Sequence, residues 1–85
     1  MREIYQLEHG KTYKTIKEYI DFDKITHKVG EIWTFDKIEF TPYYSGLSLF
    51  VIKDKENKMF RFQAAPEEQD ELINNFLQYI EPLEI

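Results

Sequence analysis

The chain has 85 residues, contains no cysteine and carries a net charge of −5. Its length predicts one domain, residues 1–85, and the lack of cysteine excludes disulfides and thiolate metal sites. Hydrophobic residues make up 42% of the chain and charged residues 32%, which is typical of a globular domain and not of a disordered segment.

The sequence has no apolar run near the roughly 18 residues of a membrane-spanning helix, and its start does not resemble a signal peptide. We therefore expect a cytoplasmic protein that does not enter a membrane. Residues 66–85 carry six acids and no Lys or Arg, while the other 65 residues carry ten acids and eleven bases. This balance disfavours a nucleic-acid partner, because such proteins present a basic surface.

Residues 12–20 are rich in β-forming residues, and alternation places Tyr13 and Tyr19 on one face, with Ile16 and Ile20 on the other. Residues 31–40 have the strongest strand pattern. The alternation changes parity after Asp36-Lys37, which predicts a bulge or tight bend there.

Residues 47–52 are apolar on nearly both faces, which predicts a central strand. Residues 59–63 alternate and predict its partner in a hairpin. Within the connecting residues 54–58, Asn57 is the residue expected to take a positive φ.

The period changes after Pro66, which suits the first turn of a helix. The following residues place one stripe at helical spacing: Gln69, Leu72, Ile73, Phe76, Leu77 and Ile80. This pattern predicts an amphipathic helix that packs on the sheet and ends near residues 79–80, before Pro82.

Four consecutive strands and one C-terminal helix predict an α+β fold. The architecture is either a small SH3-like β-barrel or a curved antiparallel sheet of about four strands closed by the helix. We favour the barrel, because Val29-Gly30-Glu31 before a strand resembles a step of SH3-like barrels, and because closure hides the edges of the sheet.

One candidate site is formed by Asp21, Asp23, His27 and Glu31. Carboxylates with an imidazole suit a divalent metal or another small ligand. The alternative, which we favour, is a network that organises a turn, because aspartates in loops often bond to their own backbone. No metal or other cofactor is therefore expected.

Residues of nucleophilic catalysis are scarce. Ser45 and Ser48 have no nucleophile-elbow context, and the three glycines lie too far apart for a phosphate loop. We do not expect an enzyme.

A second candidate binding site combines Trp33 with the loop that contains Tyr43 and Tyr44. Aromatic side chains of this kind are common at binding surfaces. Adjacent tyrosines cannot both face the core from one strand, so we expect Tyr43 to point inward and Tyr44 outward.

Several motifs resemble those of a family of small, mostly bacterial domains of unknown function. They are Gly10-Lys11-x-Tyr13, Asp21-x-Asp23, His27-x-x-Gly30-Glu31-x-Trp33-x-Phe35, Phe40-x-Pro42-Tyr43-x-x-Gly46-Leu47-x-Leu49-Phe50 and Glu68-Gln69. One departure is Lys24, where the family pattern has glycine. The resemblance implies a compact, independent domain and gives no activity or ligand.

The leading functional hypothesis is a non-enzymatic module that binds a protein or peptide, with Trp33, Tyr43 and Tyr44 as contacts. An inhibitor or immunity-type protein is one form of it, using the acidic residues 67–71 against a basic partner. The alternative is a small metal- or ligand-binding protein that uses Asp21, Asp23 and His27. The sequence does not fix the oligomeric state.

Overall fold

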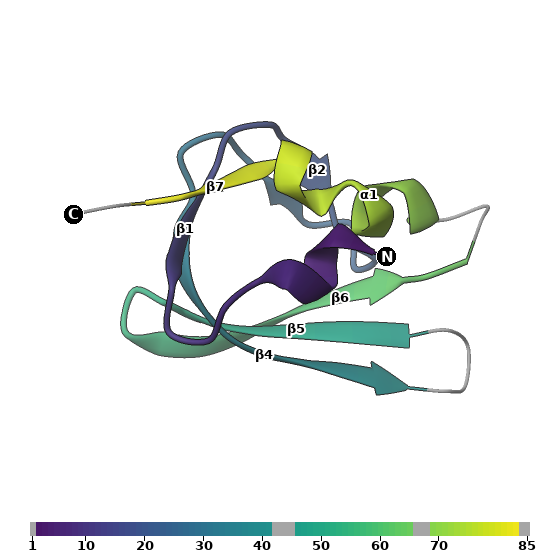
Figure 1. The fold of residues 1–85 in the computed structure, drawn as a ribbon, viewed down its shortest axis with the longest axis horizontal. Helices are drawn as coiled ribbons and strands as arrows, with labels where there is room; N and C mark the ends of the chain where they lie inside the picture. The colour runs from purple at the N-terminus through teal and green to yellow at the C-terminus, as the bar shows by residue number, and fades with distance from the viewer. Residues whose placement is uncertain (1, 42–45, 66–68, 84–85) are drawn as a thin grey trace.

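A computed structural model describes residues 2–41, 46–65 and 69–83. Its elements in chain order are η1 (Glu3–Gln6), β1 (Thr12–Thr15), β2 (Tyr19–Ile20), β3 (Thr26–His27), β4 (Ile32–Thr41), β5 (Gly46–Lys53), β6 (Glu56–Gln63), α1 (Asp70–Asn74), η3 (Phe76–Gln78) and β7 (Ile80–Pro82). Five strands form a curved antiparallel sheet in the order β6-β5-β4-β1-β7, and β2 pairs with β3 as a separate hairpin (Figure 1).

The β4–β5–β6 meander follows the predicted alternation. β5 lies between β6 and β4, and its Leu47, Leu49 and Val51 are buried in the core, while Ile52 is exposed on the opposite face. The predicted bulge is confirmed, because the register of β4 against β5 shifts between Phe35 and Lys37.

The β5–β6 hairpin turns at Asp54 and Lys55, whose φ values are 54° and 66°. Lys53 pairs with Glu56 across this two-residue loop. Positive φ at both central residues matches the twist of the flanking strands. The prediction of a positive φ at Asn57 is therefore wrong, because Asn57 already lies in β6 and pairs with Ile52.

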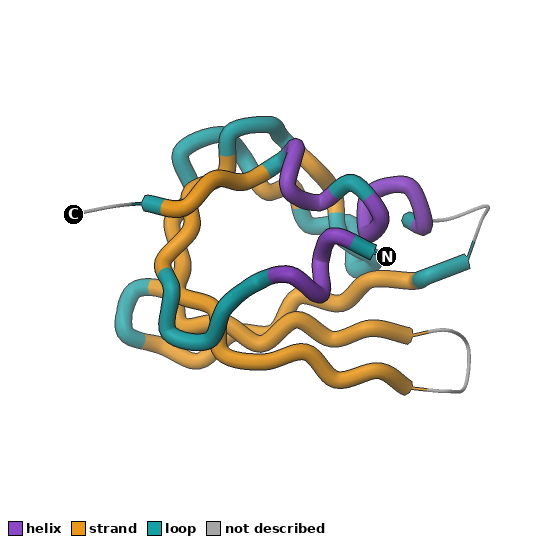
Figure 2. Tube along the Cα trace, in the orientation of Figure 1, coloured by secondary structure: helices purple, strands orange, loops and turns teal. Residues whose placement is uncertain are grey.

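The core lies between the concave face of the sheet and the helical segments. Tyr13 of β1 pairs with Trp33 of β4, and their ring centroids lie 5.6 Å apart. Ile4 of η1, Ile73 of α1 and Phe76 of η3 are fully buried against them. Figure 2 shows the helical turns gathered together on one side of the curled strands.

The predicted fold class is wrong. Within the described residues the sheet is open, with β6 and β7 at its edges, so it is not a closed SH3-like barrel, and it has five strands instead of four. No C-terminal helix closes it, so the fold is mainly antiparallel β and not α+β. α1 ends at Asn74, η3 is a single turn, and β7 follows at Ile80 and pairs with β1.

Half of the predicted stripe is nevertheless buried, because Ile73, Phe76 and Ile80 all reach the core. A spacing of three or four residues satisfies short α and 3₁₀ turns as well as a long helix. The open edge of β1 then takes Ile80–Pro82 as a strand, which gives its backbone groups partners. No helix among the described residues is long and apolar enough to cross a membrane.

Candidate functional site

Asp21 organises the turn between β2 and β3. Its Oδ1 accepts hydrogen bonds from the backbone N–H groups of Asp23 (2.9 Å) and Ile25 (3.1 Å). Within this turn Lys24 has a φ of 67°, which is unusual for a residue with a side chain. The structure therefore has a left-handed turn at Lys24, the position where the resemblance led us to expect a glycine.

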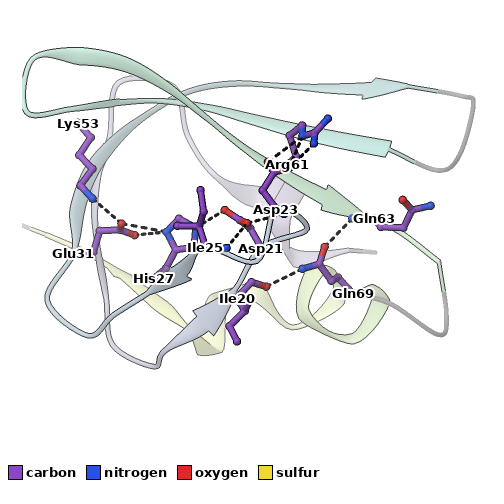
Figure 3. Close-up of polar contacts among 10 residues, drawn as sticks. All are labelled: Ile20, Asp21, Asp23, Ile25, His27, Glu31, Lys53, Arg61, Gln63 and Gln69. Atoms are coloured by element: carbon purple, nitrogen blue, oxygen red, sulfur yellow. Dashed lines mark hydrogen bonds and ion pairs between the residues drawn. The ribbon is translucent and has the colours of Figure 1, made fainter.

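His27 is the centre of a buried network of charged groups (Figure 3). Its Nε2 lies 2.8 Å from Oδ2 of Asp21, and its Nδ1 lies 2.8 Å from Oε1 of Glu31. Lys53 donates from Nζ to Oε2 of Glu31 at 2.8 Å. Ionised carboxylates only accept hydrogen bonds, so contacts on both ring nitrogens favour the doubly protonated form of His27, an imidazolium.

The positive and negative groups of this network stabilise one another in their charged forms. Burial alone lowers the pKa of His27, but the hydrogen bonds from its ring to Glu31 and Asp21 outweigh burial and raise it. Burial raises the pKa of Glu31, but the donors His27 and Lys53 outweigh it, so the pKa is lowered. Two carboxylates therefore face two cations, and the buried group is close to neutral as a whole.

Aromatic rings enclose the imidazolium. The ring of Tyr19 stacks on His27 at 4.7 Å between centroids, and the ring of Phe60 lies on it at 4.3 Å. Burial, followed by the negative charge of Glu31, raises the pKa of Tyr19, so its hydroxyl stays protonated. These contacts exclude water from the His27–Asp21 pair.

Asp23 points away from this network. Its carboxylate forms a two-pronged ion pair with the guanidinium of Arg61 on β6, which lowers the pKa of Asp23. The backbone N–H of Phe22 donates to the carbonyl of Arg61 at 2.8 Å. The β2–β3 turn is thereby attached to the outer edge of β6.

A surface hollow lies beside the network, where the β5–β6 hairpin faces β3. We call it the hairpin hollow. It has a volume of about 310 Å³. Its lining comprises Ile25, His27, Glu31, Lys53, Asp54, Glu56, Lys58, Met59 and Phe60. The side chains of Ile25 and Met59 on its walls are 58% and 47% exposed, whereas His27 is only 1% exposed.

The family model described as "Domain of unknown function (DUF3601)" matches residues 3–85. The chain belongs to this family. A similar solved structure is an integron cassette protein from the mobile metagenome of Vibrio cholerae, with 30% sequence identity and a TM-score of 0.89. That match covers 98% of this chain and 92% of the other. No curated protein sequence matches the chain.

These matches confirm the resemblance at the level of a small domain of unknown function. The motifs and the bacterial distribution that we attached to the family stay predictions. The comparisons establish the family and the fold of this DUF3601 domain, and they assign no activity to it.

Of the predicted ligand set, the structure brings Asp21 and His27 together with Glu31, but Asp23 binds Arg61 instead. In the described part of the chain, no group of three or more His, Asp and Glu side chains is arranged to hold a metal ion. The contacts of Asp21 are those of the turn-organising network that we favoured from the sequence.

The aromatic site is placed differently from the prediction. Trp33 is 1% exposed and packs in the core, so it does not present its ring to a partner. Its buried position follows from the alternation of β4, which points Trp33 and Phe35 to the same concave face. Tyr43 and Tyr44 lie outside the described residues.

Lys53 and Arg61 were missed as members of the site. Lys53 contacts Glu31, which lies 22 residues earlier in the chain. Arg61 contacts Asp23 of the β2–β3 turn, which lies 38 residues earlier. The only sequence signal was the position of Arg61 within the predicted strand 59–63 and of Lys53 directly after the predicted strand 47–52.

Proposed function

We propose that this domain is a non-enzymatic interaction module that binds a protein or peptide at the hairpin hollow. The observation that carries the proposal is the exposure of two apolar side chains, Ile25 and Met59, on the walls of one concave surface. The nine lining residues include these two, Phe60 and six ionisable residues, so the hollow combines apolar contact area with charged groups that can orient a partner.

The apolar surface continues from the hollow onto the outer face of the sheet. Met59 pairs directly with Phe50 of β5, and Ile52 lies two residues further along the same face with 43% exposure. Side chains of directly paired residues lie close together across a sheet. Lys37 stands at the border of this surface, with its ammonium 5.1 Å from the centroid of the Phe50 ring. An apolar centre with a charged rim is the arrangement of many protein interfaces.

The buried network supports binding rather than catalysis. A general base needs a free nitrogen or oxygen within reach of the proton that it removes. Both nitrogens of His27 are engaged by carboxylates, and Glu31 is engaged by His27 and Lys53. The network instead ties the turn at Asp21 to the end of β5 and so fixes the two walls of the hollow.

The test is affinity selection of random linear peptides displayed on phage, followed by calorimetry with the selected peptides. Ile25→Asp places a charge in the hollow and should abolish binding. Ile20→Asp is the matched control, because Ile20 lies on the paired strand β2, is 51% exposed and does not line the hollow. Both residues are exposed, so each change should alter stability by less than about 0.5 kcal/mol. Failure to select any peptide, or equal binding by both variants, contradicts the proposal.

A further inference from the structure

The β6 edge is half open, and the hydrogen-bond pattern shows which half. In an antiparallel hairpin with a two-residue loop, the residues that flank the loop bond to each other, and every second residue after them does the same. Here the flanking residues are Lys53 and Glu56. The N–H and C=O groups of the intervening residues point away from β5: Asn57, Met59, Arg61 and Gln63.

The later part of this edge is covered. The carbonyl of Arg61 accepts from Phe22. Gln63 donates its N–H to Oε1 of Gln69 at 2.9 Å, and its carbonyl accepts from the backbone N–H of Gln69 at 3.1 Å. These contacts confirm that the backbone groups of Arg61 and Gln63 point away from β5, as the hydrogen-bond pattern of the hairpin requires.

The earlier part is open. Within residues 2–41, 46–65 and 69–83, no backbone group of Asn57 or Met59 has a hydrogen-bond partner beyond the sheet. We call the backbone groups of these two residues the free edge. Met59 and its neighbours Lys58 and Phe60 line the hairpin hollow, and Ile25 and His27 line it from the opposite side. The free edge therefore borders the hollow at Met59, while Asn57 lies between the lining residues Glu56 and Lys58.

We infer that the partner binds as an extended segment that adds a strand to β6 at Asn57 and Met59. The inference rests on the proposed function and specifies the backbone geometry of binding. Addition of a strand gives affinity through main-chain hydrogen bonds and selectivity through alternate side chains. One side chain of the segment then enters the hollow, where Ile25 and Phe60 favour an apolar group.

A second copy of the chain is a poorer occupant. Two free edges that pair antiparallel place Asn57 of one copy opposite Met59 of the other. The residue between them is Lys58, so the two Lys58 side chains face each other directly. Like charges in directly opposed positions destabilise a strand pair. A partner segment without a cation at that position avoids the repulsion.

The experiment compares two substitutions at one exposed position, using peptides selected on phage against the wild-type domain. Asn57→Pro removes an N–H of the free edge but no hydrogen bond to β5, which is the position where an edge strand tolerates proline. Asn57→Ala is the control and keeps the N–H. We expect Asn57→Pro to weaken binding at least about tenfold, the equivalent of one lost hydrogen bond, and Asn57→Ala to leave it unchanged.

Amide hydrogen exchange of the wild-type domain gives a second readout that does not depend on the folding of a variant. The amides of Asn57 and Met59 should exchange rapidly in the free domain and slowly with peptide bound. If Ile25→Asp abolishes binding but these amides stay unprotected, the partner uses the hollow without adding a strand, and only this inference fails. If binding is insensitive to Ile25→Asp, or if no peptide is selected, the proposed function fails as well. Protection of both amides in a dimer of the domain alone also overturns the inference, because the occupant is then a second copy.

Discussion

The substitution Asp21→Asn tests the charged network directly. Asparagine keeps the shape of the side chain and the Oδ1 acceptor for the N–H groups of Asp23 and Ile25. It loses the charge-assisted bond to Nε2 of His27, and hydrogen bonds to charged groups contribute about 1.5–3 kcal/mol. We expect Asp21→Asn to lower the free energy of unfolding by about 2–3 kcal/mol. Asp21→Ala also loses the two backbone bonds and should cost about 3–5 kcal/mol, as breaking a buried pair does.

The dependence of stability on pH should carry the signature of the same groups. The pKa of His27 is raised above its ordinary 6.5, so its contribution is complete below about pH 6.5 and is lost as the pH rises through the folded-state pKa. The pKa of Glu31 is lowered below its ordinary 4.5, so its contribution is complete above about pH 4.5 and is lost as the pH falls through the folded-state pKa. The free energy of unfolding should therefore be highest between about pH 4.5 and 6.5.

Urea unfolding at a series of pH values measures these effects, and NMR titration of the His27 ring reports its pKa. Asp21→Asn removes one of the two acceptors that raise the pKa of His27, so the decline of stability on the alkaline side should still begin near pH 6.5 but end at a lower pH and be smaller in total. The reasoning is refuted if Asp21→Asn is as stable as the wild type, or if the pKa of His27 in the wild type is 6.5 or below.

Three further predictions concern other parts of the domain. Lys24→Gly should raise the free energy of unfolding by about 0.5–1 kcal/mol, because glycine adopts a φ of 67° without strain; a loss of stability in urea contradicts this. Phe76→Ala should cost about 3–5 kcal/mol and Leu77→Ala less than about 0.5, because Phe76 is fully buried and Leu77 is 37% exposed; equal midpoints refute the core assignment. EDTA and Zn²⁺ should leave the melting temperature unchanged, whereas a rise of several degrees with one metal, lost in Asp23→Ala, supports the metal alternative.

The strands of the meander were predictable because each depends on local alternation. Residues 47–52 and 59–63 fall within β5 and β6, and the parity change after Asp36 identified the bulge of β4. The turn was less predictable, because Asp54 and Lys55 have side chains and give no glycine signal for positive φ. The pairing of Lys53 with Glu56 decides their conformation.

In the C-terminal segment, the spacing of apolar residues predicts which residues are buried but not which secondary structure they form. The stripe correctly selected Ile73, Phe76 and Ile80 as buried residues, but the same spacing fits a long helix and a path of short turns that ends in a strand. The unpaired edge of β1 decided between the two paths, and that edge exists only after β1 has paired with β4.

The sequence by itself determined the strands β5 and β6 and the bulge of β4, because alternation acts locally, but the α+β fold class that it predicted is wrong. It also placed Asp21, His27 and Glu31 in one pattern, because they lie within eleven consecutive residues. Only the tertiary structure decided that Lys53 completes the network, that Arg61 removes Asp23 from it, and that Trp33 is buried. The first two outcomes depend on contacts between residues 22 and 38 positions apart in the chain, and the third depends on which face of the curved, open sheet holds the core.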